Sequence, residues 1–114
     1  MDQVKVVINK KIGGFSLSLE AVARYCELRG LQHDIRMVSD EVEGVFVNGI
    51  PFYYRSLIDR NDKHLARMVE EMGEKANTVY SELKVVEIPD GIDYIIMEND
   101  DGREYIAEKF RTWD

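Results

Sequence analysis

Several residue types that mark special classes of protein are scarce in this chain. It has one cysteine, Cys26, so neither an intrachain disulfide nor a cysteine-based zinc cluster can form. No apolar run approaches the ~20 residues that span a bilayer, and none opens the chain as a leader would. Internal repeats, linkers and low-complexity tracts are also absent. The sequence therefore predicts a cytoplasmic protein with no membrane partner.

Basic charge is scarce as well. The 15 Lys and Arg residues stand against 22 Asp and Glu, for a net charge of −7. Binding of polymeric nucleic acid needs many Lys or Arg contacts to phosphates, so we expect no such partner. The charge is uneven, because residues 1–36 carry six basic side chains against four acidic ones. A small anionic ligand is therefore expected to find a local basic site on an acidic body.

The pattern of apolar residues predicts one domain over residues 1–114, of the α+β class. We expect a largely antiparallel β-sheet with two helices packed on it and a protruding hairpin. The nearly continuous apolar run of the first strand predicts a central strand that is covered on both faces. The predicted helices are Leu19–Arg29 and Lys63–Asn77, and the predicted strands are Gln3–Asn9, Asp34–Val38, Lys84–Ile88, Asp93–Glu98 and Arg103–Lys109.

Two local signals add detail to this fold. Asn48-Gly49 lies between two β-rich runs and predicts a type I′ hairpin over residues 45–54 that concentrates aromatic surface. Gly73 weakens the second helix by about 1 kcal/mol relative to alanine. There we expect either a close packing contact or a distortion late in the helix. The aromatic residues of the hairpin are Phe46, Phe52, Tyr53 and Tyr54.

The segment Gly13-Gly14-Phe15-Ser16 joins the first strand to the first helix. Such a loop presents backbone N–H groups, and a phosphate at the N-terminus of the helix is one interpretation. It lacks the glycine spacing of a dinucleotide site and the Gly-Lys-Ser/Thr ending of a P-loop. The alternative is a tight strand-to-helix connection, which these residues alone favour.

No constellation of side chains predicts catalysis, a metal or a cofactor. His33 and His64 lack partners at ligand spacing, and Asp100-Asp101 belongs to a turn rather than to a calcium loop. Cys26 lies on or near the apolar face of a helix, where a thiol fills space. The sequence therefore predicts a protein that is not an enzyme.

Four arginines are candidates for phosphate contacts, since the guanidinium is a planar and permanently charged fork. The alternative is that they are solvated and pair with the abundant carboxylates. Together with the glycine loop they make up the predicted ligand-binding set: Gly13, Gly14, Phe15, Arg24, Arg60, Arg103 and Arg111.

Three segments, taken in combination and order, resemble a family of small proteins encoded by phages and prophages. The first joins Lys5-Val-Val-Ile-Asn9 to Gly13–Val22. The second runs from Asp59-Arg-Asn-Asp62 to the end of its helix at residues 72–77. The third is Val85–Gly91 continued by Glu104–Trp113. The chain departs from the pattern at Phe110, where histidine is more usual.

The resemblance implies a function that composition does not. The family is identified as including a Thoeris anti-defence protein, a sponge that binds cyclic ADP-ribose-type signals of bacterial TIR immune proteins without cleaving them. It implies a homo-oligomer in the host cytoplasm, ligand pockets shared between protomers, and further sites for cyclic oligonucleotides. The resemblance makes Arg24, Arg60 and Arg111 the best candidates for phosphate contacts. The alternatives are a protein–protein adaptor or inhibitor that uses the aromatic hairpin, and an enzyme acting on a nucleotide.

Overall fold

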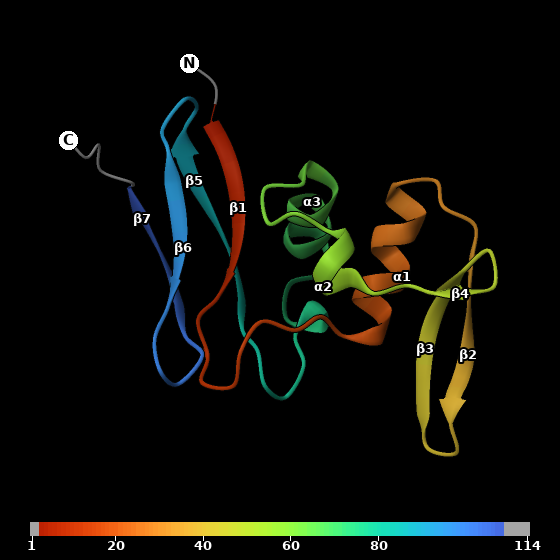
Figure 1. Ribbon diagram of the computed structural model, residues 1–114. Coiled ribbons are helices and arrows are strands. Elements are labelled where there is room, and N and C mark those ends of the chain that lie inside the picture. The colour runs from red at the N-terminus through yellow and green to blue at the C-terminus, as the bar shows by residue number, and fades with distance from the viewer. Residues whose placement is uncertain (1–2, 109–114) are drawn as a thin grey trace, which may run out of the picture.

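The computed structural model describes residues 3–108, and its helices lie between two groups of strands (Figure 1). The β1–β5 pair and the β6–β7 hairpin are on one side of the helices, and β2, β3 and β4 are on the other. The elements are β1 (Gln3–Asn9), α1 (Leu19–Leu28), β2 (His33–Ser39), β3 (Val42–Val47), β4 (Ile50–Pro51), α2 (Tyr54–Leu57), α3 (Lys63–Met72), a 3₁₀ helix η1 (Gly73–Ala76), β5 (Leu83–Pro89), β6 (Tyr94–Glu98) and β7 (Glu104–Glu108).

Every strand pairing in this part of the chain is antiparallel, and the α+β class is confirmed. The strands form three separate sheets, however: β1–β5, β2–β3–β4 and β6–β7. The two longer helices are the reason. Helices α1 and α3 pack on each other, with α3 against β1 and β5 and α1 against β2 and β3. Because the helices fill the space between them, the first two sheets share no edge.

Strand β1 is covered on both faces, as predicted, but it is not a central strand. Val6 and Val7 are both fully buried although their side chains point to opposite faces. Val7 belongs to the core formed with the helices, and the β6–β7 hairpin lies on the other side of β1 (Figure 1). The only strand that pairs with β1 in the described residues is β5. The continuous apolar pattern of β1 thus reflects two covering layers, the helices on one face and the β6–β7 hairpin on the other, and not a second paired strand.

Residues at the helix ends set the helix boundaries. Ser18 caps α1, since its hydroxyl accepts from Ala21 N at 3.1 Å, and Gly30 ends the helix at φ +71°. The second predicted helix, Lys63–Asn77, is shorter than expected, because α3 ends at Met72 and η1 follows. Gly73 makes this break at φ +58°, and nothing lies within 4 Å of where its side chain would begin. Of the two expectations for Gly73, the structure therefore shows the distortion and not the close contact.

The protruding hairpin is β2–β3, and it turns at residues 40–41 rather than at Asn48-Gly49. Asn48-Gly49 does form the tight two-residue turn between β3 and β4, with both residues at positive φ. The short helix α2 follows directly and was not expected from the sequence. Of the four aromatic side chains predicted to gather on this hairpin, only Tyr53 is exposed.

The core centres on Tyr25, Leu65 and Met68, which are fully buried between the two longer helices and the sheets. The ring of Tyr25 lies 6.2 Å from that of Phe52. Its hydroxyl donates to Asp62 at 2.7 Å, so one core side chain links α1 to the start of α3. None of the helices in residues 3–108 is long and apolar enough to cross a membrane.

Asp62 is the residue on which the start of α3 depends. Its carboxylate accepts from His64 N at 2.7 Å, from Leu65 N at 3.2 Å and from the Tyr25 hydroxyl. Burial raises the pKa of Asp62, but these hydrogen bonds outweigh burial and hold the pKa below its usual value. The same site raises the pKa of Tyr25 to about 12, chiefly through burial.

We expect Asp62→Ala to lower the free energy of unfolding by about 1–2 kcal/mol at neutral pH. Because the folded pKa of Asp62 lies below the unfolded one, its stabilisation is present above about pH 4 and is lost as the pH falls through the folded value. Urea denaturation over a pH series measures this. The matched control is Asp59→Ala, which removes a nearby exposed carboxylate and should change stability by less than about 0.5 kcal/mol. Equal effects of the two substitutions would contradict the assignment.

Candidate functional site

Two glycine turns, one from each end of the chain, pack against each other at the candidate site. Gly13 N donates to Asp101 O at 2.9 Å, and a Cβ on Gly102 would lie 2.6 Å from Gly14 N. A Cβ on Gly13 would also meet Tyr80 O at 2.8 Å. Gly13 and Gly102 are therefore required by packing. Gly14 is required only by its φ of +104°, since its missing side chain would meet nothing.

Residues 15–18 separate the glycine loop from the start of α1 at Leu19, which favours the alternative of a tight strand-to-helix connection over a phosphate at the helix N-terminus. Ser16 and Leu17 are buried between the loop and the helix, and Ser18 occupies the helix start. Ser18 N donates to Ala76 O at 3.0 Å, and its hydroxyl donates to Lys75 O at 2.7 Å. The backbone N–H and the hydroxyl of Ser18 are thus both used within the fold.

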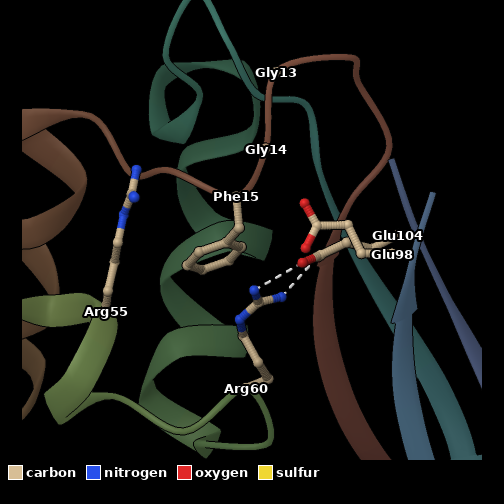
Figure 2. A pocket seen from close by; sticks show the side chains of 7 residues that line it. All are labelled: Gly13, Gly14, Phe15, Arg55, Arg60, Glu98 and Glu104. Atoms are coloured by element: carbon tan, nitrogen blue, oxygen red, sulfur yellow. Dashed lines mark hydrogen bonds and ion pairs between the residues drawn. The ribbon is translucent and has the colours of Figure 1, made fainter. Parts of the chain in front are cut away.

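A hollow of about 320 Å³ opens beside the glycine loop (Figure 2). The loop, α2, the segment before α3 and the β6–β7 hairpin contribute to its wall. Two arginines and two glutamates line it, so its charge is balanced although the protein is acidic. The lining residues are Gly13, Gly14, Phe15, Arg55, Arg60, Glu98 and Glu104.

Arg60 and Glu104 form the most buried ion pair among residues 3–108. The two terminal nitrogens of Arg60 donate to the two carboxylate oxygens of Glu104 at 2.7 and 2.8 Å, and the Glu104 side chain is 5% exposed. The Arg60 guanidinium lies over the ring of Phe15, with Cζ 3.6 Å from the ring centroid. Arg60 is thus held on three sides, because it also donates to Val7 O at 3.2 Å.

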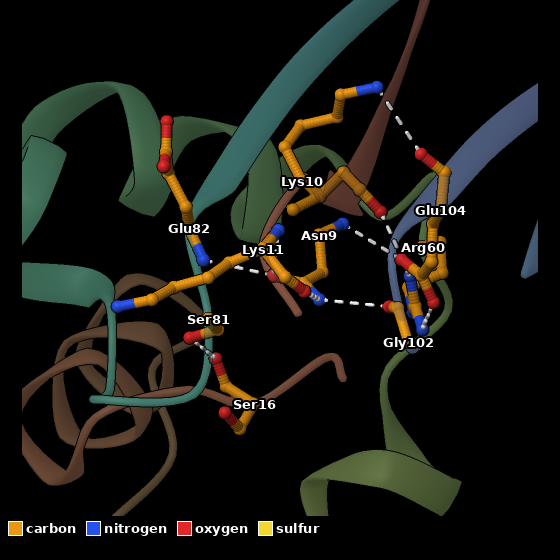
Figure 3. Close-up of polar contacts among 10 residues, drawn as sticks. Asn9, Lys10, Lys11, Ser16, Arg60, Ser81, Glu82, Gly102 and Glu104 are labelled. Carbon is orange, nitrogen blue, oxygen red and sulfur yellow. Dashed lines mark hydrogen bonds and ion pairs between the residues drawn. The ribbon is translucent and has the colours of Figure 1, made fainter. Parts of the chain in front are cut away.

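Asn9 joins the same network from the end of β1 (Figure 3). Its backbone N donates to Glu104 Oε1 at 2.8 Å, and its side-chain amide donates to Gly102 O at 3.1 Å and to Lys11 O at 2.7 Å. Its side-chain oxygen accepts from Glu82 N at 2.9 Å and from Lys11 N at 3.2 Å. This fully buried amide connects β1, the start of β5 and the β6–β7 turn.

Arg55 is the cation of the hollow that remains available. It extends from α2 toward the rim (Figure 2) and forms no ion pair within residues 3–108. Glu98, at the end of β6, is likewise exposed and makes no ion pair in that range. The site therefore offers one exposed guanidinium and one exposed carboxylate over a floor formed by Phe15 and Arg60.

The structure brings four of the seven predicted ligand-binding residues together: Gly13, Gly14, Phe15 and Arg60. Arg24 is elsewhere, on α1, where it makes two hydrogen bonds to Glu71 at 2.6 and 2.9 Å. Arg103 pairs with Asp101 at 2.7 Å, and this pairing holds the pKa of Asp101 below its usual value. Arg24 and Arg103 thus match the alternative interpretation of arginines paired with carboxylates. Arg111 lies outside the described residues.

Sequence reasoning missed Arg55, Glu98 and Glu104. Arg55 and Glu98 carry no local pattern that separates them from other surface charges. Glu104 alternates with Ile106 and Glu108 on one face of its strand, so that face carries two glutamates. The sequence does not distinguish the buried glutamate from the exposed one.

Other chemistry finds little support in the described part of the chain. No cluster of three or more His, Cys, Asp or Glu side chains there is arranged to hold a metal ion. Cys26 is fully buried, and burial raises the pKa of its thiol. His33 and His64 lie on different elements, β2 and α3.

Comparison with protein-family models, with curated proteins and with solved structures finds no match to this chain.

The Arg60–Glu104 pair gives a direct test of how the site is built. Glu104→Gln keeps the shape of the side chain but leaves the Arg60 guanidinium without a full counter-charge. We expect the free energy of unfolding to fall by about 3 kcal/mol. The control is Glu70→Gln, the same substitution in the exposed Lys5–Glu70 pair at 2.9 Å, which should cost less than about 1 kcal/mol. Chemical denaturation of both variants measures the difference, and similar losses would contradict the assignment.

Proposed function

We propose that the protein binds and sequesters a small cyclic nucleotide in the hollow between the glycine loop, α2 and the β6–β7 hairpin. The observation that carries the proposal is the exposed Arg55 guanidinium beside an aromatic and arginine floor in a hollow of about 320 Å³. The resemblance to phage and prophage proteins supplies the ligand class, a cyclic ADP-ribose-type immune signal. On this proposal the protein disables a host defence by holding the signal unchanged.

The chemistry of the lining residues suits such a ligand. Arg55 has the planar fork that recognises phosphate oxygens, and Glu98 can accept from ribose hydroxyl or base amino groups. Gly14 leaves room for close approach, because nothing lies within 4 Å of its missing Cβ. Arg60 is not free for a phosphate, since Glu104 takes its two terminal nitrogens. Arg60 therefore forms part of a rigid floor of the hollow, and Arg55 is the residue that would contact the phosphate.

The size of the hollow limits what one chain can enclose. Sites for small molecules have volumes of about 300–1,000 Å³, so this one is at the lower end of the range. Nanomolar affinity requires about 12 kcal/mol of binding free energy. A pocket shared between protomers, which the resemblance implies, would enclose more of the ligand than one chain does.

One observation favours the adaptor as a second candidate. Three large apolar side chains next to the predicted aromatic hairpin are exposed, namely Ile50, Tyr53 and Leu57. Exposed apolar groups of this kind are common at protein interfaces. Ile50 and Tyr53 lie within the segment 45–54 that the sequence singled out, and Leu57 is the last residue of α2. A protein partner would contact this surface rather than the hollow.

Calorimetric titration with cyclic ADP-ribose isomers and cyclic di- and trinucleotides tests the ligand class. We expect submicromolar binding of at least one compound by the wild-type protein, and a loss of about 10- to 100-fold in Arg55→Ala, from the missing charged hydrogen bonds. Arg24→Ala is the control, because Arg24 is paired with Glu71 on a different element. Loss of affinity in Arg24→Ala alone would move the site away from the hollow. No binding across the panel would overturn the nucleotide proposal and favour the protein partner.

The fate of the ligand separates sequestration from turnover. After saturation, the protein is heat-denatured and the released compound is compared with the input by chromatography and mass spectrometry. We expect it to return unchanged and in a stoichiometric amount. A converted product would contradict sequestration and favour the enzyme among the alternatives.

A further inference from the structure

Strand β2 is an open edge with apolar side chains on both faces. In the described residues it pairs only with β3, and each of residues 34–39 is exposed. Ile35, Met37 and Val38 are 46%, 55% and 60% exposed. A hollow of about 490 Å³ runs beside the edge between Asp34, Arg36 and the Asn48-Gly49 turn, so no described segment covers it there. Long open edges of this kind are templates for pairing with another strand.

The backbone of β2 points its unused groups outward at Ile35. Phe52 N donates to Val45 O at 2.9 Å, so the polar groups of Val45 face β4 and not β2. Val45 is directly opposite Ile35 in the β2–β3 register. In an antiparallel pair the residues that exchange hydrogen bonds alternate with those that do not. The N–H and C=O of Ile35 therefore face the open edge, as do those of His33 and Met37.

Ile35 is also the central residue of the regularly paired part of β2. The β2–β3 register is regular from His33 to Met37 and shifts between Met37 and Ser39, so the straight segment is centred on Ile35. Two copies of this segment, antiparallel and centred on Ile35, place Ile35 opposite Ile35 and His33 opposite Met37. All the outward N–H and C=O groups of the segment then find partners.

The charges agree with this register. In it, Asp34 of each copy is opposite Arg36 of the other, on the same face of the joined sheet, at the closely spaced pairs that do not exchange backbone bonds. Within one chain these two side chains already attract each other, with Arg36 Nε 2.6 Å from Asp34 Oδ2. Pairing of two copies would close a ring of four alternating charges. Opposite charges directly across strands stabilise a sheet, and like charges destabilise it.

We propose that the partner of this edge is a second copy of the chain, joined antiparallel through β2 with Ile35 on the two-fold axis. The interface extends the three-stranded sheet of each copy into one continuous six-stranded sheet. It buries Ile35 and part of Met37, and it uses the reciprocal Asp34–Arg36 pairs to fix the register. This association needs no ligand.

Charge reversal tests the register in the full chain without ligand. Sedimentation equilibrium over a wide concentration range should show a wild-type dimer. Asp34→Arg and Arg36→Asp should each weaken association at least tenfold, because each brings like charges together twice in the dimer. The double variant Asp34→Arg/Arg36→Asp should restore it. Glu70→Lys, which reverses a charge on α3, is the control and should leave association unchanged.

The opposite results are equally clear. A wild-type chain that stays monomeric at all concentrations would overturn the proposal. A dimer whose association is unchanged by both single charge reversals would also overturn it, because the interface would then lie elsewhere. The same holds if the double variant associates no more tightly than the single variants. A second variant, Ile35→Pro, removes an N–H that the chain itself does not use, and proline is tolerated at such an edge position. It should leave the far-ultraviolet circular dichroism unchanged and abolish the dimer.

Discussion

The carboxylate of Glu104 is the group on which the arrangement of this molecule depends. It accepts both terminal nitrogens of Arg60 and the backbone N of Asn9, which come from segments 44 and 95 residues away in sequence. The β6–β7 hairpin pairs with no other strand in the described residues, so its place beside β1 rests on this carboxylate, on Gly102 and on packing. The free edge of β1 is also completed here, because Val7 N donates to Arg60 O at 2.9 Å. The backbone O and the guanidinium of Arg60 thus bond to Val7 where a neighbouring strand would otherwise pair.

This use of Arg60 decides what the hollow can offer a ligand. An arginine that gives both terminal nitrogens to a buried carboxylate is a poor partner for a phosphate, since breaking the pair would leave Glu104 buried and uncompensated. Its contact with Phe15 makes a fixed surface instead. On the proposed function, Arg55 then supplies the charge that faces the ligand, since its guanidinium forms no ion pair within residues 3–108 and lies 5.9 Å from the ring centroid of Tyr54. A fixed floor beside this guanidinium would favour binding without large rearrangement.

Local signals in the sequence predicted the two longer helices and most strands, although not α2, and they did not predict which groups become partners. Ser18, Gly30 and Asp62 mark helix ends through contacts within a few residues, and Asn48-Gly49 makes its turn by backbone conformation alone. The continuous apolar run of β1 predicted burial of both faces, yet two different layers supply it. Arg24 and Arg103 carry the charge that a phosphate site requires, but Glu71 and Asp101 take them. The pairing of each arginine with a particular carboxylate depends on packing between segments far apart in sequence, and the spacing of residues along the chain does not predict it.

The hollow and the open edge of β2 lie on opposite sides of the helices. The hollow is next to α2 and the β6–β7 hairpin, whereas β2 is beyond α1 (Figure 1). Pairing through β2 would therefore leave the two hollows of a dimer separate, each open to its own ligand. A pocket closed by two protomers needs a different contact, and the outward face of the β6–β7 hairpin, with Ile95, Met97 and Tyr105 exposed, lies nearer the hollow. A ligand-to-chain ratio of one, with independent sites, is what pairing at β2 alone would give.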